Sequence, residues 1–246
     1  RALALGDAAQ LDQAESRGHP APRRRKALAY INVYKFNTSM SEPTDTDAAR
    51  DSWDPDHYHR FRAERRRPYD DLVRLLRPVA GGSLVDLGCG TGELTADAAV
   101  ALGASRALGI DASAAMLERA AEVSSPDVAI SFQMGDIAAF GTSTHDGRWD
   151  VVMANAALQW VPRHVEVLAQ WRSTLNPAGQ LAVQVPANVD HRSHTTITEV
   201  LGEAEFAEYA ADVPDDPVHS VLDPAHYAEV LFDLGAPDPL VRLQVY

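Results

Sequence analysis

Short apolar runs alternate with amphipathic stretches along most of the chain after residue 83. The apolar runs predict strands, and the stretches between them, where apolar residues recur every three or four positions, predict helices. This alternation indicates a mainly parallel sheet that is covered on both faces. We predict strands at 84–87, 107–110, 129–133, 150–154, 180–185 and 241–246, and helices at 92–102, 113–123, 163–174, 194–210 and 224–234.

A helical pattern precedes the first of these strands. It covers residues 56–77, and Asp54 followed by Pro55 suits the N-terminus of a helix. Pro68 interrupts the pattern, because proline lacks the backbone N–H that a helix interior uses. We therefore expect two helices, or one helix with a break, that meet near Arg67.

The first 39 residues differ from the rest of the chain. They show no sustained apolar period, and their Lys and Arg residues outnumber Asp and Glu by four. The basic run at 23–26 is interpreted as a solvated charge run, with a targeting or phosphate-binding patch as the alternative. We find no apolar h-region of a signal peptide after it, so a secretory signal is not indicated. We expect residues 1–39 to be a disordered or marginally helical extension, and 40–246, beginning at Met40, to form one domain.

Composition narrows the possible classes of protein. The chain has 246 residues, 46% of them hydrophobic, which suits one α/β domain with a full core. The net charge is −13, and most of the acidity lies beyond residue 39, so nucleic acid is not an expected partner. No apolar run is long enough to cross a bilayer, so we expect no membrane partner. The single cysteine, Cys89, fits a reducing compartment, and we expect a cytoplasmic protein.

The segment 84–92 carries the most informative pattern in the sequence. A buried strand, LVDL, runs into Gly88, Gly90 and Gly92, and a predicted helix follows. Glycine allows the positive φ angles of a tight turn and lets a ligand approach the main chain closely. Glu93 stands where a dinucleotide-binding turn has its third glycine. A carboxylate there would repel a pyrophosphate but is compatible with the cationic end of S-adenosylmethionine (SAM).

Polar residues follow the predicted strands in an order that is found in a known family. Asp86 precedes the glycine turn, Asp111 ends the next apolar run, and Asp136 follows the third. Asn155 follows the fourth, and a turn at 175–180 precedes the fifth. This ordered set resembles the motifs of the class I SAM-dependent methyltransferases. The resemblance implies a Rossmann-like, doubly wound, mainly parallel sheet of the seven-stranded type, with helices on both faces.

The resemblance also implies which residues bind the cofactor. In that family an acid in the place of Asp111 holds both ribose hydroxyls, and an acid in the place of Asp136 lies beside the adenine. The cofactor-binding residues that it implies are Asp86, Gly88, Cys89, Gly90, Gly92, Asp111, Ala112, Met116, Asp136, Ile137 and Asn155.

The end of the predicted sheet departs from the family pattern. Sheets of this family usually finish with two further strands, the last of which is antiparallel to its neighbour. Only the first of these two is found in the sequence, at 241–246. We therefore expect a sheet that lacks its C-terminal strand and has an open edge in its place.

Three further clusters are more specific than the glycine turn. They lie at 53–68, at 155–160 and at 183–188, and they resemble segments of the trans-aconitate 2-methyltransferases. This resemblance implies methyl transfer from SAM to a carboxylate of trans-aconitate. It places lid helices over 53–77, and the substrate-binding residues that it implies are Trp53, Tyr58, Arg65, Arg67, Gln159 and Trp160.

The implied reaction needs few chemical groups from the protein. A carboxylate acceptor is already ionised at neutral pH, so we nominate neither a catalytic base nor a metal. Arg65 and Arg67 would clamp carboxylates of the substrate, unless they are solvated or pair with Glu64 and Asp70. Two other functions stay open: methylation of another small acid, phenol or amine, and SAM binding without catalysis. We expect a monomer whose partner is a small tricarboxylate.

Overall fold

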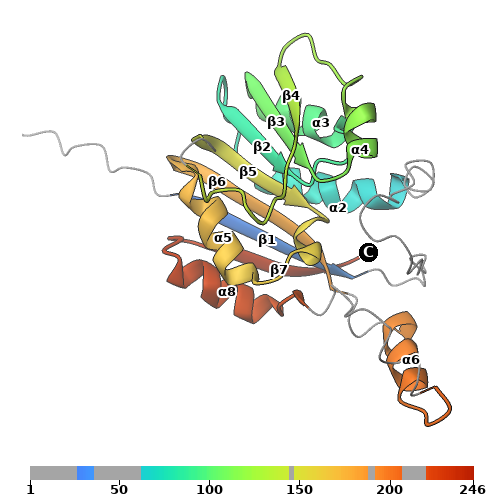
Figure 1. Cartoon of the computed structure of the whole chain (residues 1–246). Coiled ribbons are helices and arrows are strands. Elements are labelled where there is room, and N and C mark those ends of the chain that lie inside the picture. Colours follow the sequence, from blue (N-terminus) through green and yellow to red (C-terminus); the bar gives the residue numbers. More distant parts are fainter. Residues whose placement is uncertain (1–26, 36–61, 144–146, 188–191, 207–219) are drawn as a thin grey trace, which may run out of the picture.

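The computed structural model describes residues 27–35, 62–143, 147–187, 192–206 and 220–246. Its centre is a sheet of seven parallel strands in the order β4-β3-β2-β5-β6-β1-β7 (Figure 1). The strands are β1 (Leu28–Lys35), β2 (Ser83–Leu87), β3 (Arg106–Asp111), β4 (Ala129–Met134), β5 (Trp149–Asn155), β6 (Leu175–Pro186) and β7 (Leu240–Val245). The helices are α2 (Arg62–Leu75), α3 (Glu93–Leu102), α4 (Ala114–Ala120), α5 (His164–Ser173), α6 (Arg192–Leu201) and α8 (Pro224–Asp233), with a short 3-10 helix, η2 (Leu158–Trp160).

The order of the strands reverses between β2 and β5. From β2 the chain moves outward through β3 to β4, then returns to the other side of β2 and continues from β5 to β6. Open parallel sheets bind ligands at the carboxyl ends of their strands, at the point of such a reversal. The sequence-based prediction of a doubly wound α/β sheet is confirmed, and its strands are all parallel.

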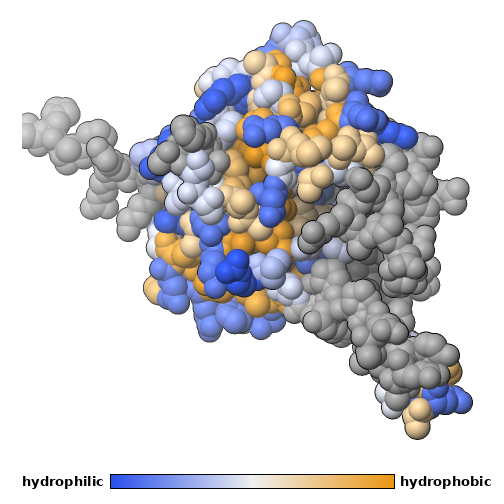
Figure 2. Space-filling model, in the orientation of Figure 1, coloured by the Kyte–Doolittle hydropathy of each residue, from blue (hydrophilic) through white to orange (hydrophobic). Residues whose placement is uncertain are grey.

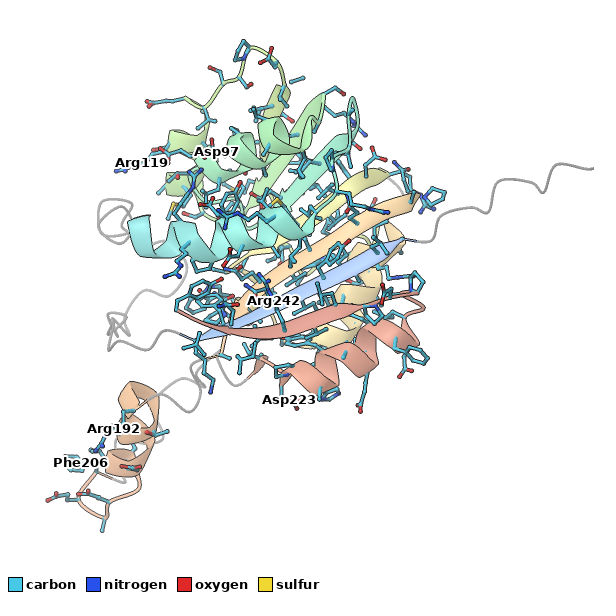
Figure 3. All side chains as sticks on the ribbon, turned by 180° about the vertical axis from the view of Figure 1, so that it is seen from behind. Asp97, Arg119, Arg192, Phe206, Asp223 and Arg242 are labelled. Carbon is cyan, nitrogen blue, oxygen red and sulfur yellow. The ribbon has the colours of Figure 1, made fainter. Side chains whose placement is uncertain are left out.

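Helices cover both faces of the sheet. α5 and α8 lie on the face turned toward the viewer in Figure 1, and α2 lies on the opposite face, which Figure 3 shows. Trp171 of α5 and Tyr227 of α8 belong to one apolar core, whereas Tyr69 and Leu72 of α2 belong to the other. All four side chains are at most 2% exposed. Burial from both sides explains why the inner strands β2, β5, β6 and β1 carry nearly continuous apolar runs, whereas the edge strands β4 and β7 are more exposed.

β1 corrects the expectation for the N-terminal segment. We expected residues 1–39 to be a disordered or marginally helical extension. This is wrong for residues 28–35, which form a strand that pairs with β6 on one side and with β7 on the other. The segment is rich in apolar, aromatic and β-branched residues, which favour strands. It is short, however, so it does not give residues 1–39 a sustained apolar period. Residues 1–26 and 36–39 lie outside the described residues.

β1 also occupies the place that was expected to be an open edge. It lies between β6 and β7, so β6 has strand partners on both sides. The strand that completes the sheet is therefore β1, from the N-terminal segment, and it is parallel to both of its neighbours. β7 forms the outer edge, where Leu243 and Val245 are 48% and 55% exposed.

α2 runs through Pro68 without a break, so the expected interruption near Arg67 is wrong for the described part of this helix. Pro68 cannot donate a backbone hydrogen bond to the preceding turn. It is buried, however, and Tyr69 and Leu72, which follow it, pack into the core. This packing offsets the missing bond and keeps the helix continuous. Residues 53–61, the remainder of the predicted lid, lie outside the described residues.

α6 lies apart from the sheet. Figures 1 and 3 show it as an arm beyond the carboxyl end of β6, and Arg192, which Figure 3 labels, lies on this arm. The helix covers the first part of the predicted 194–210 segment. None of the helices that the structure describes has the length and apolar character needed to cross a membrane.

Candidate active site

The glycine turn joins β2 to α3 in left-handed backbone conformations. The φ angles of Gly88, Gly90 and Gly92 are 82°, 55° and 76°. A Cβ atom on Gly88 would lie 2.3 Å from the Cβ of Ala157, and one on Gly92 would lie 2.4 Å from Phe132. A Cβ on Gly90 would meet nothing within 4 Å. Gly88 and Gly92 therefore allow close packing of the turn, while the backbone at Gly90 borders open space.

Asp111 links the glycine turn to the turn after β3. Its Oδ2 accepts a hydrogen bond from the backbone N–H of Gly90 at 2.8 Å, and its Oδ1 accepts one from Ser113 at 2.9 Å. The Ser113 hydroxyl in turn caps α4 by accepting from the N–H of Met116. A carboxylate has about four acceptor sites, so both oxygens of Asp111 can accept further hydrogen bonds. This geometry suits a ligand with two neighbouring hydroxyls.

Asp86 is a buried acid with one unsatisfied oxygen. It is 3% exposed, and its Oδ2 accepts a hydrogen bond from the Thr95 hydroxyl at 2.6 Å. Its Oδ1 has no hydrogen-bond partner. Burial, helped by the charge of Asp111, raises the pKa of Asp86 to about 6. A buried oxygen without a partner is costly, and a cationic ligand group such as an ammonium would satisfy it.

The raised pKa of Asp86 predicts how stability depends on pH. Between the ordinary value of 3.8 and about 6, the folded protein holds a proton that the unfolded chain releases. This contribution to the free energy of unfolding therefore falls as pH rises through that window, by about 3 kcal/mol in total. Asp86→Asn should remove the fall and stabilise the protein above pH 6. Urea unfolding from pH 3.5 to 7 measures the free energy of unfolding across this window.

A second carboxylate, Asp150, has a pKa shifted in the opposite direction, so its contribution to stability should change with pH in the opposite sense. Hydrogen bonds from Asn176 and Ser83 lower the pKa of Asp150, which lies at the amino end of β5. Asp150→Asn should therefore remove stability that is present above the ordinary carboxyl pKa and lost in acid. If the free energy of unfolding of the wild type and of Asp86→Asn depended on pH in the same way, the raised pKa of Asp86 would be refuted.

The last residue of β5 and the segment after it carry two more unsatisfied oxygens. Oδ1 of Asn155 and Oε1 of Gln159 are buried and have no hydrogen-bond partner, while Nε2 of Gln159 donates to the carbonyl of Ala156 at 2.8 Å. Gln159 is 5% exposed, whereas its neighbour Trp160 is 48% exposed. Together with Asp86, these residues place three unpaired acceptors at the carboxyl ends of the two central strands. Such atoms are ordinarily satisfied, so their grouping points to a ligand site.

The residues after β4 form a third part of the same edge. Asp136 is exposed, and its Oδ1 accepts from the backbone N–H of Ala138 at 2.8 Å. Ile137 is half-buried, and its carbonyl accepts from the indole of Trp171 at 2.9 Å. Figure 2 shows apolar surface over β4 and α5, and Met134, which ends β4, is 58% exposed. An acid beside apolar surface suits a flat heterocycle with amino donors.

The other predicted cofactor residues lie in the same turns. Met116 is 4% exposed and Ala112 is exposed. Cys89 is buried, and burial raises the pKa of its thiol far above neutrality. Its thiol is therefore protonated at neutral pH and is a poor nucleophile.

The structure gives a mixed result for the predicted substrate residues. Trp53 and Tyr58 lie outside the described residues, as does the side chain of Arg65. The guanidinium of Arg67 lies over the ring of Tyr246, 5.5 Å from its centroid. The predicted alternative is that Arg67 is solvated or pairs with Asp70. Arg67 is exposed, which agrees with the first part, whereas the described ion pair of Asp70 is with Arg66 at 3.1 Å.

Sequence reasoning missed several residues of this region. Thr95 was overlooked, although it lies on the first turn of the helix that follows the glycine turn, where a hydroxyl can face back toward β2. Tyr246 donates to Asp71 at 2.9 Å and so joins the end of β7 to α2. No local pattern could reveal that contact, because 175 residues separate its two partners.

Comparisons with known proteins agree with this site. A family model described as "Methyltransferase domain" matches residues 84–179. The trans-aconitate 2-methyltransferase of Deinococcus radiodurans is 42% identical over 200 residues, which cover 79% of this chain and 74% of that protein. The Streptomyces avermitilis enzyme of the same name is 37% identical over 195 residues, covering 76% and 70%. In a solved complex of the Haloferax volcanii Trm112 methyltransferase activator with a methyltransferase, a chain shares the fold with a TM-score of 0.57. That chain is 21% identical, and the match covers 76% of this chain and 77% of that one.

The reversed strand order, the glycine turn and the acid that ends β3 define a SAM-dependent methyltransferase of class I. Sequence identities of 37–42% to two trans-aconitate 2-methyltransferases, over about three quarters of the chain, identify the family within this class. The chain belongs to the trans-aconitate 2-methyltransferase family.

Proposed function

We propose that this protein transfers a methyl group from SAM to one carboxylate of trans-aconitate and so forms a monomethyl ester. The observation that carries the proposal is the 42% identity to a curated trans-aconitate 2-methyltransferase across most of both chains. The unpaired acceptors at the carboxyl ends of β2 and β5 support it, since they supply a site for a cationic cofactor.

Each part of the carboxyl edge has a role in this proposal. The two oxygens of Asp111 accept hydrogen bonds from the ribose hydroxyls, and Asp86 faces the ammonium of the methionine end. Asp136 and Ile137 border the adenine, and Asn155 lies beside the amino-acid end. The other residues proposed to line the cofactor site are Gly88, Cys89, Gly90, Gly92, Ala112 and Met116.

The chemistry is a displacement at carbon. When bound, SAM supplies an electrophilic methyl group on a sulfonium. One carboxylate oxygen of the acceptor displaces the thioether and takes the methyl group, and no proton moves. Carboxyl groups ionise near pH 4, so the protein needs no general base. Its tasks are to align the acceptor oxygen and to exclude water, and Gln159 and Trp160 are proposed to border the acceptor for that purpose.

The first experiment measures methyl transfer from labelled SAM to trans-aconitate, with cis-aconitate, citrate and isocitrate for comparison. Strong preference for trans-aconitate is the expected result. Transfer to a phenol or amine instead would keep the class of enzyme and replace the acceptor. Calorimetric binding of SAM without transfer to any acceptor would indicate a binding protein.

Arg67 is proposed to bind a carboxylate of the acceptor. It lies at the carboxyl edge of the sheet, beside Tyr246 at the end of β7. Loss of one charge-assisted hydrogen bond, about 1.5–3 kcal/mol, predicts that Arg67→Ala raises the KM for trans-aconitate at least tenfold. The affinity for SAM should not change. Steady-state kinetics and calorimetry give the two values.

Arg74 supplies the control for this substitution. It lies two turns further along α2, pairs with Asp71 at 2.7 Å and is 71% exposed. Arg74→Ala should leave the KM unchanged, because an exposed ion pair contributes little. An equal rise in KM for both variants would assign the effect of Arg67 to the packing of α2.

We further propose that the protein acts as a monomer in the cytoplasm. Its one cysteine is buried, which suits a reducing compartment. Light scattering after size-exclusion chromatography should give the mass of one chain, 26.7 kDa. A mass of twice that value would contradict the monomer.

A further inference from the structure

A buried pair of polar side chains joins α5 to α8. His164 begins α5 and is 3% exposed, and Tyr227 of α8 is fully buried. Nδ1 of His164 and the hydroxyl of Tyr227 lie 2.7 Å apart, and the two rings are nearly parallel, at 14°. Burial lowers the pKa of the imidazole and raises that of the phenol, so both are neutral near pH 7. The proposed reaction uses neither group.

The imidazole also borders the segment that carries Gln159 and Trp160. The backbone carbonyls of Leu158 and Val161 lie close enough to the ring to oppose the effect of burial on its pKa. Nε2 of His164 has no hydrogen bond of good geometry. His164 therefore contacts α8 through the Tyr227 hydroxyl, and its imidazole also lies near the carbonyls of Leu158 and Val161 in the segment that carries Gln159 and Trp160.

The same segment contains strained backbone near both of its ends. Ala156 and Arg163 have φ angles of 52° and 58°, in the left-handed region that residues with a Cβ rarely adopt. Such residues persist only where surrounding contacts hold them. At one end, the N–H of Ala156 donates to the carbonyl of Gln184 at 2.9 Å. At the other end, His164 directly follows Arg163 and is anchored by Tyr227.

We propose that His164 and Tyr227 are positioning residues that fix the segment 156–163 and thereby set where Gln159 and Trp160 meet the methyl acceptor. This inference rests on the proposed function, which places the acceptor beside that segment. Neither residue contacts the reacting atoms in this proposal. The pair makes the geometry of the acceptor side depend on α8, an element that follows all the cofactor motifs in the sequence.

Tyr227→Phe tests the pair, because it keeps the ring and removes only the hydroxyl. The kcat/KM for trans-aconitate should fall about tenfold, as expected for one buried hydrogen bond that aligns the acceptor. The Kd for SAM should stay within about twofold, since none of the predicted cofactor residues changes. Hydrogen exchange of the amides in 156–163 should become faster than in the wild type.

Two further variants separate positioning from general stability. Tyr69→Phe removes another buried hydroxyl, which donates to the carbonyl of Leu94 at 2.6 Å on the opposite face of the sheet. It should lower the Tm by a similar amount but leave exchange in 156–163 unchanged. His164→Asn keeps a hydrogen-bonding atom near the position of Nδ1 and should retain most activity, whereas His164→Leu should not.

The outcomes are distinct. A lower Tm for Tyr227→Phe with unchanged exchange in 156–163 and unchanged acceptor kinetics would overturn the inference, since the pair would then be purely structural. Failure of the wild type to methylate any of the acids would instead contradict the proposed function. The exchange measurement would still decide whether the pair holds the segment.

Discussion

Gly88→Ala is expected to abolish measurable SAM binding and to destabilise the protein strongly. The φ angle of 82° costs a residue with a Cβ about 1–2 kcal/mol. The new methyl group would also lie 2.3 Å from the Cβ of Ala157, and overpacking of this kind costs about 1–3 kcal/mol more. The turn and the segment after β5 must then move apart, which separates the two halves of the site. Urea unfolding and calorimetry with SAM measure the two losses.

Two variants isolate the steric part of this effect. Gly81 has a φ of 72° and nothing within 4 Å of a Cβ, so Gly81→Ala carries only the backbone cost, about 1–2 kcal/mol. Its affinity for SAM should match the wild type. Adding Ala157→Gly to Gly88→Ala removes the clash, because the next atom, Cα of Ala157, lies 3.7 Å away. If the double variant binds SAM no better than Gly88→Ala, the contact with Ala157 is not the cause.

The geometry of the turns after β2 and β3 could be predicted from the sequence because its signals are local. A strand of buried residues, a glycine turn and an acid at the end of the next strand recur within short distances along the chain. Gly90 and Asp111 are 21 residues apart, and their hydrogen bond follows from the pairing of β2 with β3. Parallel pairing of neighbouring strands brings such residues to one edge of the sheet.

The contacts of Tyr246 and Tyr227, and the β6-β1-β7 part of the sheet, could not be predicted in the same way. Tyr246 and Tyr227 contact α2 and α5 through pairings across 175 and 63 residues, which no short pattern encodes. β1 was misinterpreted for a related reason. A strand of eight residues inside a basic, irregular segment shows its role only when its partners, β6 and β7, are in place.

A chain that begins at Met40, and so lacks β1, is expected to lose cooperative unfolding and to aggregate. Removal of β1 exposes the backbone edges of β6 and β7 together. It also removes the fully buried side chains of Ile31 and Val33, each of which contributes about 1.5–3 kcal/mol. Unpaired edges promote association with other chains. Circular dichroism during urea titration and size-exclusion chromatography measure the two effects.

A buried polar contact makes β1 specific for its place in the sheet. The Asn32 amide donates to Oε1 of Gln184 at 3.1 Å and accepts from Nε of Arg242 at 3.1 Å, so it joins β6, β1 and β7. Figure 3 labels Arg242 on the face that α2 covers. A shift of β1 by one residue would turn this amide to the other face and leave its partners unpaired. Asn32→Ala should therefore cost about 2–4 kcal/mol, most of it from the unsatisfied partners.

The matched control begins at Ala27 and lacks only residues 1–26. It retains every contact of β1 that the structure describes, so its unfolding midpoint should equal that of the full chain. Cooperative unfolding with an unchanged midpoint in the chain from Met40 would show that another segment can fill the place of β1. The effect of Asn32→Ala would then distinguish the two cases, because that substitution destabilises the full chain only if β1 lies between β6 and β7.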